Sequence, residues 1–451
     1  MFGIDKARGL VISMLRVDYI RDAPKTPGSR VKIGGRVVRV TDLKSARFFW
    51  IRDVTGAIQV TVLKKKTEPE LMKLVEELMP NDFLVIEGSV PEEIKAASGA
   101  EIVPSKITVV SKSQAPSPID IEGFNESSID KRLDWRALDL RNPRQTAIFV
   151  IQSKLMEGMQ KYFYSHRFMQ TFTPSLMGTS SEGGSEVFGL KHFGKNAFLR
   201  QDPQLHRELL MLAGFEKIYE IGPSWRAELS NTPQHLTEHR TCASEISFIE
   251  DERDVMKVEE NVIMHAVKAV VDDCQEELKL FDTKLEVPKL PLPVLEFPGV
   301  YDILEELGFK SNRGKEDYSK QGEMALGRYV KEKYGADFFF INRFPYAIKP
   351  FYVMRVDDEP EWARSTDLIY RGVEMSSGGQ REHRYEKIIE QAKGKGLDVD
   401  NLKWFTEFFR YGAPPHGGFS IGMERLTMQI LGLSNVREAA LFPRAPERLI
   451  P

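Results

Sequence analysis

The stretch of residues 222–248 combines charged side chains at a spacing that could bind phosphate. Arg226 and Glu228 lie two residues apart, on one face of a predicted strand, and the chain returns with His235 and Glu245. An arginine guanidinium meets phosphate with a flat fork of donors, and a nearby carboxylate holds that fork in place. The pattern predicts two strands around a charged hairpin that binds a polyphosphate. A solvated charged hairpin is the alternative, because charged side chains are usually exposed.

A second stretch places oxygen donors and an arginine around two adjacent glycines. Asp367 and Glu374 are carboxylates of the kind that a magnesium–phosphate site uses. Gly378 and Gly379 allow close approach of the backbone, and Arg381 offers a bidentate clamp for a carboxylate. These residue types predict a metal–phosphate site beside a carboxylate-binding arginine.

A third stretch is rich in glycine and ends in a helix. Gly417, Gly418 and Gly422 let a strand lie tight against a ligand. A helix is predicted from Glu424 onward, and Arg425 lies in its first turn. This arginine is the second candidate for a phosphate or nucleotide contact.

The elements that must position these residues point to an α+β domain with an antiparallel sheet, because strands and helices do not alternate regularly. The chain lacks both the Gly-x-Gly-x-x-Gly and the Gly-Lys-Ser/Thr phosphate loops, so side chains must hold any nucleotide. The predicted elements are a helix from Thr146, a strand at Phe168–Pro174, helices at Gln204–Ala213 and Val255–Ala269, and strands at Phe338–Ile341 and Phe351–Val353.

The N-terminal part is predicted to be a small closed β-barrel of the oligonucleotide-binding (OB) kind, since five short strands surround one helix at Glu68–Leu78. Side chains alternate across a strand, so at least one ring of Phe48, Phe49 and Trp50 faces outward and could stack a nucleobase. Packing of all three rings in the core or rim is the alternative. The five strands are Val31–Val40, Phe48–Ile51, Ile58–Leu63, Phe83–Glu87 and Ile107–Val110.

Composition bounds the class of protein and the number of domains. The 451 residues suggest two or three domains, predicted as a barrel over 1–112, a hinge over 113–142 and a catalytic domain over 143–451. The net charge of -3 argues against nucleic-acid binding by bulk charge alone. The two cysteines, Cys242 and Cys274, allow no disulfide framework. No apolar run approaches membrane-spanning length, and the start of the sequence does not resemble a signal peptide. A cytoplasmic protein without a membrane partner is expected.

The three stretches together resemble the signature motifs of the class II (subclass IIb) aminoacyl-tRNA synthetases for aspartate, asparagine and lysine, over nearly the whole chain. Phe168–Pro174 resembles the first motif, Trp225–Glu228 with its return strand the second, and Gly417–Leu426 the third. The run Ser376-Ser-Gly-Gly-Gln-Arg381 resembles the archaeal and eukaryotic aspartate branch more than the asparagine branch.

The resemblance implies a role for each part of the site. It implies that Arg226, Glu228 and Arg425 are catalytic and that Asp367 and Glu374 hold Mg2+. The ATP-binding residues that it implies are Arg226, Glu228, His235, Leu236, His239, Glu374, Gly422 and Arg425. The amino-acid-binding residues are Ser181, Glu182, Gln204, Arg207, Ser377 and Arg381, the anticodon-binding residues are Phe48, Gln59 and Glu101, and the dimer interface contains Pro174.

The implied reaction is ATP-dependent activation of L-aspartate to the adenylate, with release of pyrophosphate, and transfer to the 3′ end of tRNA(Asp) by a homodimer. AMP leaves in the second step, and no protein nucleophile is needed, since catalysis is positioning and charge neutralisation. Three alternatives stay open. They are an enzyme that also charges tRNA(Asn), a paralogue with shifted specificity (an asparaginyl-tRNA synthetase or an amide ligase like the asparagine-synthetase relatives), and an RNA-binding protein with an inactive catalytic domain.

Several positions depart from the family pattern. Arg207 replaces a lysine that helps to bind the aspartate side chain, and Ala243 replaces an aspartate near the substrate amino group. His239 replaces a phenylalanine that stacks on adenine, Arg36 replaces a barrel tryptophan, and Ser420 replaces a glycine. The amino-acid and tRNA specificity are therefore less firmly predicted than the nucleotide chemistry.

Overall fold

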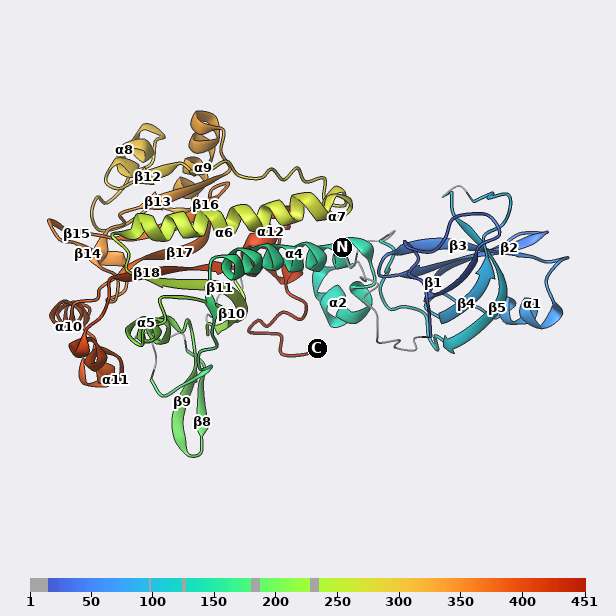
Figure 1. The fold of residues 1–451 in the computed structure, drawn as a ribbon, viewed down its shortest axis with the longest axis horizontal. Coiled ribbons are helices and arrows are strands. Elements are labelled where there is room, and N and C mark those ends of the chain that lie inside the picture. The colour runs from blue at the N-terminus through green and yellow to red at the C-terminus, as the bar shows by residue number, and fades with distance from the viewer. Residues whose placement is uncertain (1–14, 97–98, 124–126, 180–186, 228–234) are drawn as a thin grey trace. The chain divides into compact units, whose positions relative to one another are not determined.

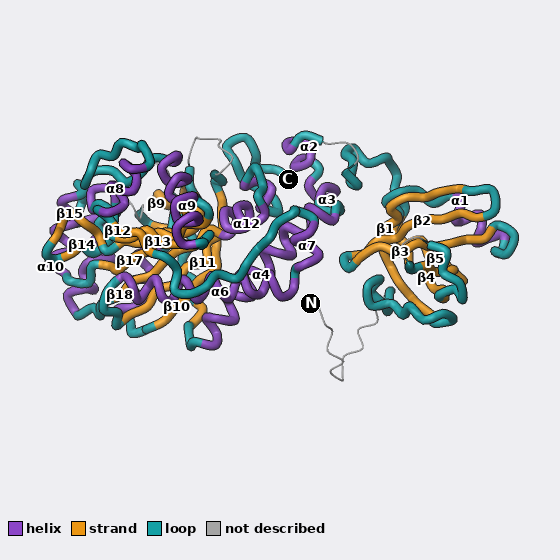
Figure 2. Tube along the Cα trace, turned by 90° about the horizontal axis from the view of Figure 1, so that it is seen from above, coloured by secondary structure: helices purple, strands orange, loops and turns teal. Residues whose placement is uncertain are grey.

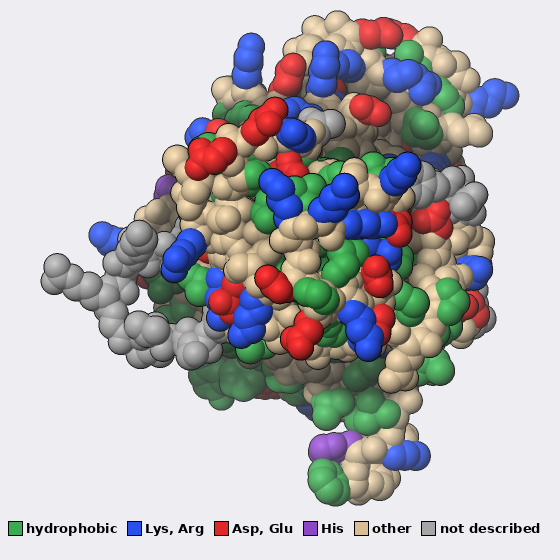
Figure 3. Space-filling view, turned by 90° about the vertical axis from the view of Figure 1, so that its right-hand side faces the viewer, with side chains coloured by type: hydrophobic (Ala, Val, Ile, Leu, Met, Phe, Trp, Pro, Cys, Tyr) green, Lys and Arg blue, Asp and Glu red, His purple; other side chains and the backbone are tan. Residues whose placement is uncertain are grey.

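The computed structural model of the chain describes residues 15–96, 99–123, 127–179, 187–227 and 235–451 (Figure 1). It divides into two compact units, Met1–Pro118 and Ile119–Pro451, each considered by itself. None of the helices in these described ranges is long and apolar enough to cross a membrane. On one face of the molecule, basic and acidic side chains are intermixed (Figure 3), as the small net charge suggests.

The first unit is a closed five-stranded barrel, which confirms the predicted OB-type fold (Figure 2). The barrel order is β1-β2-β3-β5-β4, with β3 and β5 parallel and the other pairs antiparallel. Its core is formed by alternate residues such as Phe49, Ile51 and Val60, none of which is solvent-exposed. The elements are β1 (Arg30–Asp42), β2 (Ala46–Asp53), β3 (Gly56–Leu63), α1 (Pro69–Glu76), β4 (Phe83–Ser89) and β5 (Glu101–Ser111).

The second unit is built on an eight-stranded sheet of order β12-β13-β16-β17-β18-β11-β10-β6. Its six central strands pair antiparallel, as predicted, and only the edge strands β12 and β6 pair parallel to their neighbours. The strands are β6 (Met169–Gln170), β10 (Lys217–Trp225), β11 (Glu238–Ser247), β12 (Val294–Glu296), β13 (Phe338–Asn342), β16 (Ser365–Tyr370), β17 (Val373–Arg381) and β18 (His416–Gly422).

One face of this sheet is apolar and is covered by helices. The helices α4 (Pro143–Ser165) and α6 (Glu252–Asp273) lie side by side (Figure 1), and α6 contacts β17 and β18. Cys242, Phe419 and Ile421 lie on this face, in one hydrophobic cluster with residues of both helices. Side chains alternate along a strand, so the neighbours of Cys242 on β11, such as Thr241, point to the opposite face of the sheet. This opposite face carries polar residues. The sheet therefore has one face for the core and one for a site.

Shorter elements surround the sheet. The helix α5 (Gln204–Leu212) matches the predicted helix, and α12 (Met423–Leu431) starts directly after β18. The remaining elements are α2 (Ile129–Asp134), α3 (Arg136–Asp139), β7 (Leu176–Met177), β8 (Gly189–His192), β9 (Lys195–Leu199), α7 (Gln275–Lys279), α8 (Gly299–Glu306), α9 (Lys320–Tyr334), β14 (Arg355–Val356), β15 (Glu359–Ala363), α10 (Tyr385–Gly394), α11 (Lys403–Thr406) and 3-10 turns at Tyr346–Ile348, Asp400–Leu402, Glu407–Tyr411 and Val436–Ala439.

The predicted hinge over residues 113–142 is shorter in the structure, because the division between the units falls after Pro118. Residues 129–139 form α2 and α3, which belong to the second unit. The buried Arg136 anchors them, since its Nη2 donates to the carbonyl oxygens of Glu438 and Ala440 at 2.9 Å each. A buried arginine with four carbonyl and carboxylate partners is not a feature of a free linker.

Candidate active site

A pocket of about 390 Å3 opens on the polar face of the large sheet. Its walls come from β11, β17 and β18, from Arg226 directly after β10, from residues 348–353, and from the start of α5 and of α12. Ten of the residues predicted from the sequence line it: Gln204, Arg226, His235, Leu236, His239, Glu374, Ser377, Arg381, Gly422 and Arg425. The pocket therefore brings together the three stretches that the sequence singled out.

Five predicted residues are not among its lining residues. Arg207 and Asp367 lie behind the lining, and both are buried. Ser181, Glu182 and Glu228 lie outside the described residues.

The hairpin that carries Arg226 is a pair of antiparallel strands, as predicted. β10 and β11 pair from Lys217 with Ile246 to Trp225 with Glu238, so Arg226 follows directly at the open end of the ladder. Its backbone N–H donates to the carbonyl of Thr237 at 3.0 Å, which keeps the two chains together one residue beyond the strands. The exposed Arg226 side chain faces the pocket.

One end of the pocket combines an arginine with carboxylates. Arg425 Nη1 lies 3.4 Å from Glu374 Oε1 and donates to the Glu374 carbonyl at 3.2 Å. Both Asp367 carboxylate oxygens accept from Lys349 Nζ at 3.3 Å. Lys349 was not predicted, because no spacing in the sequence relates it to Asp367.

This end suits a divalent cation bound together with phosphate. Desolvation and the charge of Asp367 raise the pKa of Glu374, and burial with the charge of Glu374 raises the pKa of Glu323 to about 7. A cation would relieve this repulsion, and carboxylate oxygens are ligands that Mg2+ prefers. No group of three or more His, Cys, Asp or Glu residues in the described ranges could hold a metal by itself. Asp367 and Glu374 therefore fit a Mg2+ site whose coordination shell is completed by phosphate oxygens, as the family resemblance implies.

The glycines of β17 and β18 serve strand packing at specific positions. A Cβ on Gly418 would lie 2.0 Å from the Ser244 carbonyl oxygen, and one on Gly378 would lie 2.6 Å from the Gly418 carbonyl oxygen. At Gly422 the nearest atom would be 3.7 Å away, an ordinary contact. The close approaches at Gly378 and Gly418 are therefore to neighbouring strands of the sheet, and the predicted approach of Gly417, Gly418 and Gly422 to a ligand stays a prediction.

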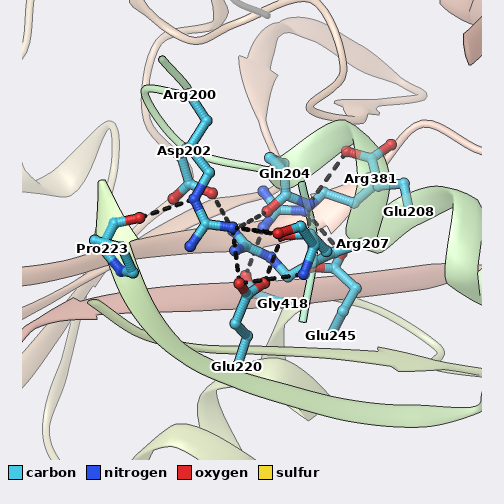
Figure 4. A network of polar contacts seen from close by, with 11 residues as sticks. Arg200, Asp202, Gln204, Arg207, Glu208, Glu220, Pro223, Glu245, Arg381 and Gly418 are labelled. Carbon is cyan, nitrogen blue, oxygen red and sulfur yellow. Dashed lines mark hydrogen bonds and ion pairs between the residues drawn. The ribbon is translucent and has the colours of Figure 1, made fainter. Parts of the chain in front are cut away.

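The other end of the pocket is a network of buried charges (Figure 4). Arg381 Nε donates to Glu245 Oε1 at 3.0 Å, and its Nη2 donates to the Gly418 carbonyl at 3.0 Å. Gln204 Nε2 donates to Glu245 Oε2 at 3.0 Å and to Glu208 Oε1 at 3.2 Å. These bonds hold Arg381 in a fixed orientation at the pocket wall.

Arg207, which was predicted to bind the amino acid, is buried behind two residues that line the pocket. Its Nη2 donates to Asp202 Oδ1 and, at 3.0 Å, to Gln204 Oε1 (Figure 4), and its side chain is 1% exposed. Asp202, which was not predicted, lines the pocket in front of it. Arg207 therefore contacts two residues that line the pocket, Asp202 and Gln204, through one nitrogen, and it is not itself among the lining residues.

His239 lies on β11 between the two ends of the pocket. Burial, and then the positive charge of Arg226, lowers the pKa of His239 to about 4. The ring is therefore neutral near pH 7. It offers a flat uncharged surface, as the predicted stacking role for adenine requires.

A buried acid lies beneath the pocket on the helix side of the sheet. Ser376 Oγ donates to Glu259 Oε1, and Oε2 of this α6 residue has no partner among the described residues. Burial raises the pKa of Glu259 to about 8, so the carboxyl is protonated near neutrality.

This protonation predicts a measurable pH dependence of stability. Between about pH 4.5 and 8 the folded chain keeps a proton that the unfolded chain has lost, so stability falls as pH rises through this window. Glu259→Gln mimics the protonated acid and removes the loss. The difference in free energy of unfolding, variant minus wild type, should increase by roughly 4 kcal/mol when the pH is raised from 5 to 9. Urea unfolding at both pH values measures this, and a constant difference would contradict it.

In the barrel, the three predicted anticodon residues lie on adjacent strands. Gln59 pairs with Trp50 on one side and with Glu101 on the other, and Phe48 pairs with Thr61 in the same sheet. Phe48 and Trp50 are partly exposed whereas Phe49 is buried, so two of the three rings face outward. Gln59 Nε2 donates to Thr61 Oγ1 at 3.2 Å, which directs it toward the row that contains Phe48.

A mostly antiparallel sheet whose polar face holds arginines and carboxylates, in a chain that also contains an OB barrel, fits the class II aminoacyl-tRNA synthetases. Comparison with protein families agrees. A family described as class II tRNA synthetases (D, K and N) matches residues 128–446, and a family described as OB-fold nucleic-acid-binding domains matches residues 31–110. The chain belongs to the class II tRNA synthetases for aspartate, lysine and asparagine, a family of enzymes.

Individual relatives cover almost the whole chain. An aspartate–tRNA(Asp) ligase of Pyrococcus furiosus is 43% identical over 439 residues, which are 97% of this chain and all of the relative. An aspartate–tRNA(Asp/Asn) ligase of Aeropyrum pernix is 37% identical over 96% of this chain and 98% of the relative. Among solved structures, asparaginyl-tRNA synthetase from Pyrococcus horikoshii complexed with asparaginyl-adenylate superposes with a TM-score of 0.90 at 31% identity, over 97% of this chain and all of that chain.

Proposed function

We propose that the protein is an aspartate–tRNA ligase, which activates L-aspartate with ATP and transfers it to the 3′ end of tRNA(Asp). The observation that carries this proposal is the buried Arg381, fixed by Glu245 and Gly418 at the wall of the pocket. A guanidinium held in one orientation is suited to a planar carboxylate. The names of relatives that are 43–44% identical support the same substrate.

The reaction needs positioning more than protein chemistry. The aspartate α-carboxylate attacks the α-phosphorus of ATP in line, and pyrophosphate leaves. Arg226 faces the pocket, where its positive charge favours the ionised forms of Asp202 and Glu374, and it would stabilise charge that develops on the α-phosphate. Arg425 and His235 would hold the γ-phosphate, and Asp367 and Glu374 would hold Mg2+, which supplies further neutralisation of phosphate charge when bound.

Aspartate-dependent exchange of pyrophosphate into ATP tests the first half of the reaction. We expect exchange with L-aspartate in the wild type. Exchange with another amino acid alone would overturn the proposal in favour of a paralogue with shifted specificity. No exchange with any amino acid would favour an RNA-binding protein with an inactive catalytic domain.

A second candidate function is the charging of tRNA(Asn) by the same enzyme. Relatives named as ligases for both tRNAs align over almost the full length, which supports it. Within the barrel, Arg36 is buried and its Nη1 donates to Asn81 Oδ1 at 3.4 Å. Charging of purified tRNA(Asp) and tRNA(Asn) transcripts distinguishes the two functions.

We propose in addition that the enzyme is a cytoplasmic homodimer. Pro174 is exposed in the single chain, and next to it Phe172 is 80% exposed. Large apolar side chains exposed in one region favour an interface. Both cysteines are free and buried, which suits a reducing compartment. Light scattering after size-exclusion chromatography measures the oligomeric state.

The barrel residues predict a separation between tRNA binding and amino-acid activation. Phe48→Ala removes a ring that is proposed to stack a base, and we expect the KM for tRNA to rise about 10-fold or more. The rate of pyrophosphate exchange should stay unchanged, because that reaction uses the other unit. Phe83→Ala removes a 40% exposed ring from β4 of the same barrel and is the matched control. An equal fall in exchange and charging would instead indicate a folding defect.

A further inference from the structure

The amino-acid end of the pocket has few carboxylates able to receive a cation. On β11 the side chains of His239 and Thr241 line the pocket, and Ala243 and Glu245 follow in alternation on the same face of the sheet. Ala243 pairs with Ser420, a lining residue of β18, so the floor carries no acid at this position. Glu245 is fully buried, and its two oxygens accept from Arg381 and Gln204.

Three carboxylates do line the pocket, namely Asp202, Glu374 and Glu424. Glu374 contacts Arg425 at the phosphate end. Glu424 is 4% exposed, and both its oxygens accept from the backbone N–H of Arg240, at 2.9 and 3.2 Å. Asp202 is therefore the lining carboxylate that remains for a cation at the amino-acid end of the described pocket.

The geometry of Asp202 suits such a contact. Its side chain is 23% exposed, into the pocket, and its one hydrogen bond among the described residues is from Arg207 to Oδ1. The same Nη2 of Arg207 donates to Gln204 Oε1 at 3.0 Å. One nitrogen thus holds two acceptor oxygens beside each other, and each of these groups keeps an unused lone pair.

The ionisation of Asp202 supports the same role. Burial opposes its charge, but the guanidinium of Arg207, together with Arg381 and Arg226, holds the pKa of Asp202 below its ordinary value. The carboxylate therefore stays charged at neutral pH. An ammonium group has three donors and no acceptor, so two adjacent oxygens, one of them charged, are a suitable receptor for it.

We propose that Asp202, beside Gln204 Oε1, receives the α-ammonium group of the amino-acid substrate, and that Arg207 is a positioning residue that aligns these two oxygens. This inference rests on the proposed function. In this proposal Arg207 does not bind the side-chain carboxylate of the substrate, and Arg381 binds it.

The test compares L-aspartate with succinate, which has both carboxylates but no ammonium group. Asp202→Asn keeps an acceptor oxygen for Arg207 and removes the charge. We expect the KM for aspartate in pyrophosphate exchange to rise about 10- to 100-fold, the range for a lost charged hydrogen bond. The inhibition constant of succinate should stay within about threefold of the wild-type value or become tighter. Arg207→Met removes the nitrogen that both oxygens share, and it should likewise weaken the binding of aspartate more than that of succinate.

Equal weakening of aspartate and succinate would overturn the proposal, since it would show that Asp202 acts only by holding Arg207 against a carboxylate. Unchanged constants for both ligands would overturn it as well. Glu220→Gln is the matched control, because Glu220 forms a similar buried pair with Arg200 at 2.8 Å but does not line the pocket (Figure 4). It should not separate the two ligands.

Failure of the proposed function would be seen separately, as absence of aspartate-dependent exchange in the wild type. The same comparison would then be made with asparagine and succinamic acid, its counterpart without the amino group. If Asp202→Asn weakened the binding of asparagine but not of succinamic acid, the ammonium contact would be supported whichever amino acid is used. Equal weakening of both ligands would overturn it.

Discussion

Arg226→Gln is expected to lower kcat for aspartate-dependent pyrophosphate exchange by roughly 10³-fold, the effect of removing a charged donor aimed at a reacting phosphate. Arg226 lies at the open end of the β10–β11 ladder, with an exposed side chain that faces the pocket. Glutamine keeps a donor but loses the positive charge. The defect should be in kcat more than in the KM for aspartate, because charge on the phosphate grows in the transition state.

The matched control for this experiment is Arg240→Gln. Arg240 lies on β11 and is also largely exposed, but its side chain contacts Glu238 at 3.1 Å and does not line the pocket. Thermal unfolding of both variants should match the wild type, since neither arginine side chain is buried. A change in kcat of less than about 10-fold for Arg226→Gln would remove this residue from the catalytic role.

Local patterns in the sequence predicted the elements that carry the site. The charged residues around 222–248 do form an antiparallel hairpin, because alternation along a strand is a local property. The spacing of Gln204 and Arg207 correctly predicted a shared helix face on α5. The predicted strand at Phe351–Val353 was wrong, since these residues are buried in a turn after Pro350 with a single bridge from Val353 to Arg381. Apolar residues that are buried in a loop resemble a buried strand in sequence.

Contacts between distant segments could not be predicted in the same way. Lys349 reaches Asp367 from a loop, and Asp202 intervenes between Arg207 and the pocket. Both contacts depend on how loops cross the ends of strands, which no periodicity encodes. The family resemblance assigned Arg207 to the substrate, whereas in the structure its guanidinium donates to Asp202 and Gln204. A role carried over by position holds only as far as the neighbours are the same.

Arg381 has a structural contact and a proposed role in substrate binding, and experiment can separate the two. It is 5% exposed, and its donors reach Glu245 and the Gly418 carbonyl, so it stabilises the sheet as well as facing the pocket. Arg381→Leu leaves the carboxylate of Glu245 buried, with Gln204 as its one remaining hydrogen-bond partner among the described residues. We expect a loss of about 3 to 5 kcal/mol in the free energy of unfolding, measured with urea, and no detectable aspartate-dependent pyrophosphate exchange.

A second substitution decides between the two functions. Adding Glu245→Met to Arg381→Leu replaces the buried ion pair by apolar side chains, which is often neutral for stability. The double variant should therefore regain most of the lost stability and still fail to activate aspartate, because no other residue with a fixed guanidinium lines that wall among the described residues. Recovery of exchange together with recovery of stability would show that Arg381 acts on the fold alone, and the carboxylate of aspartate would then have to be bound elsewhere in the pocket.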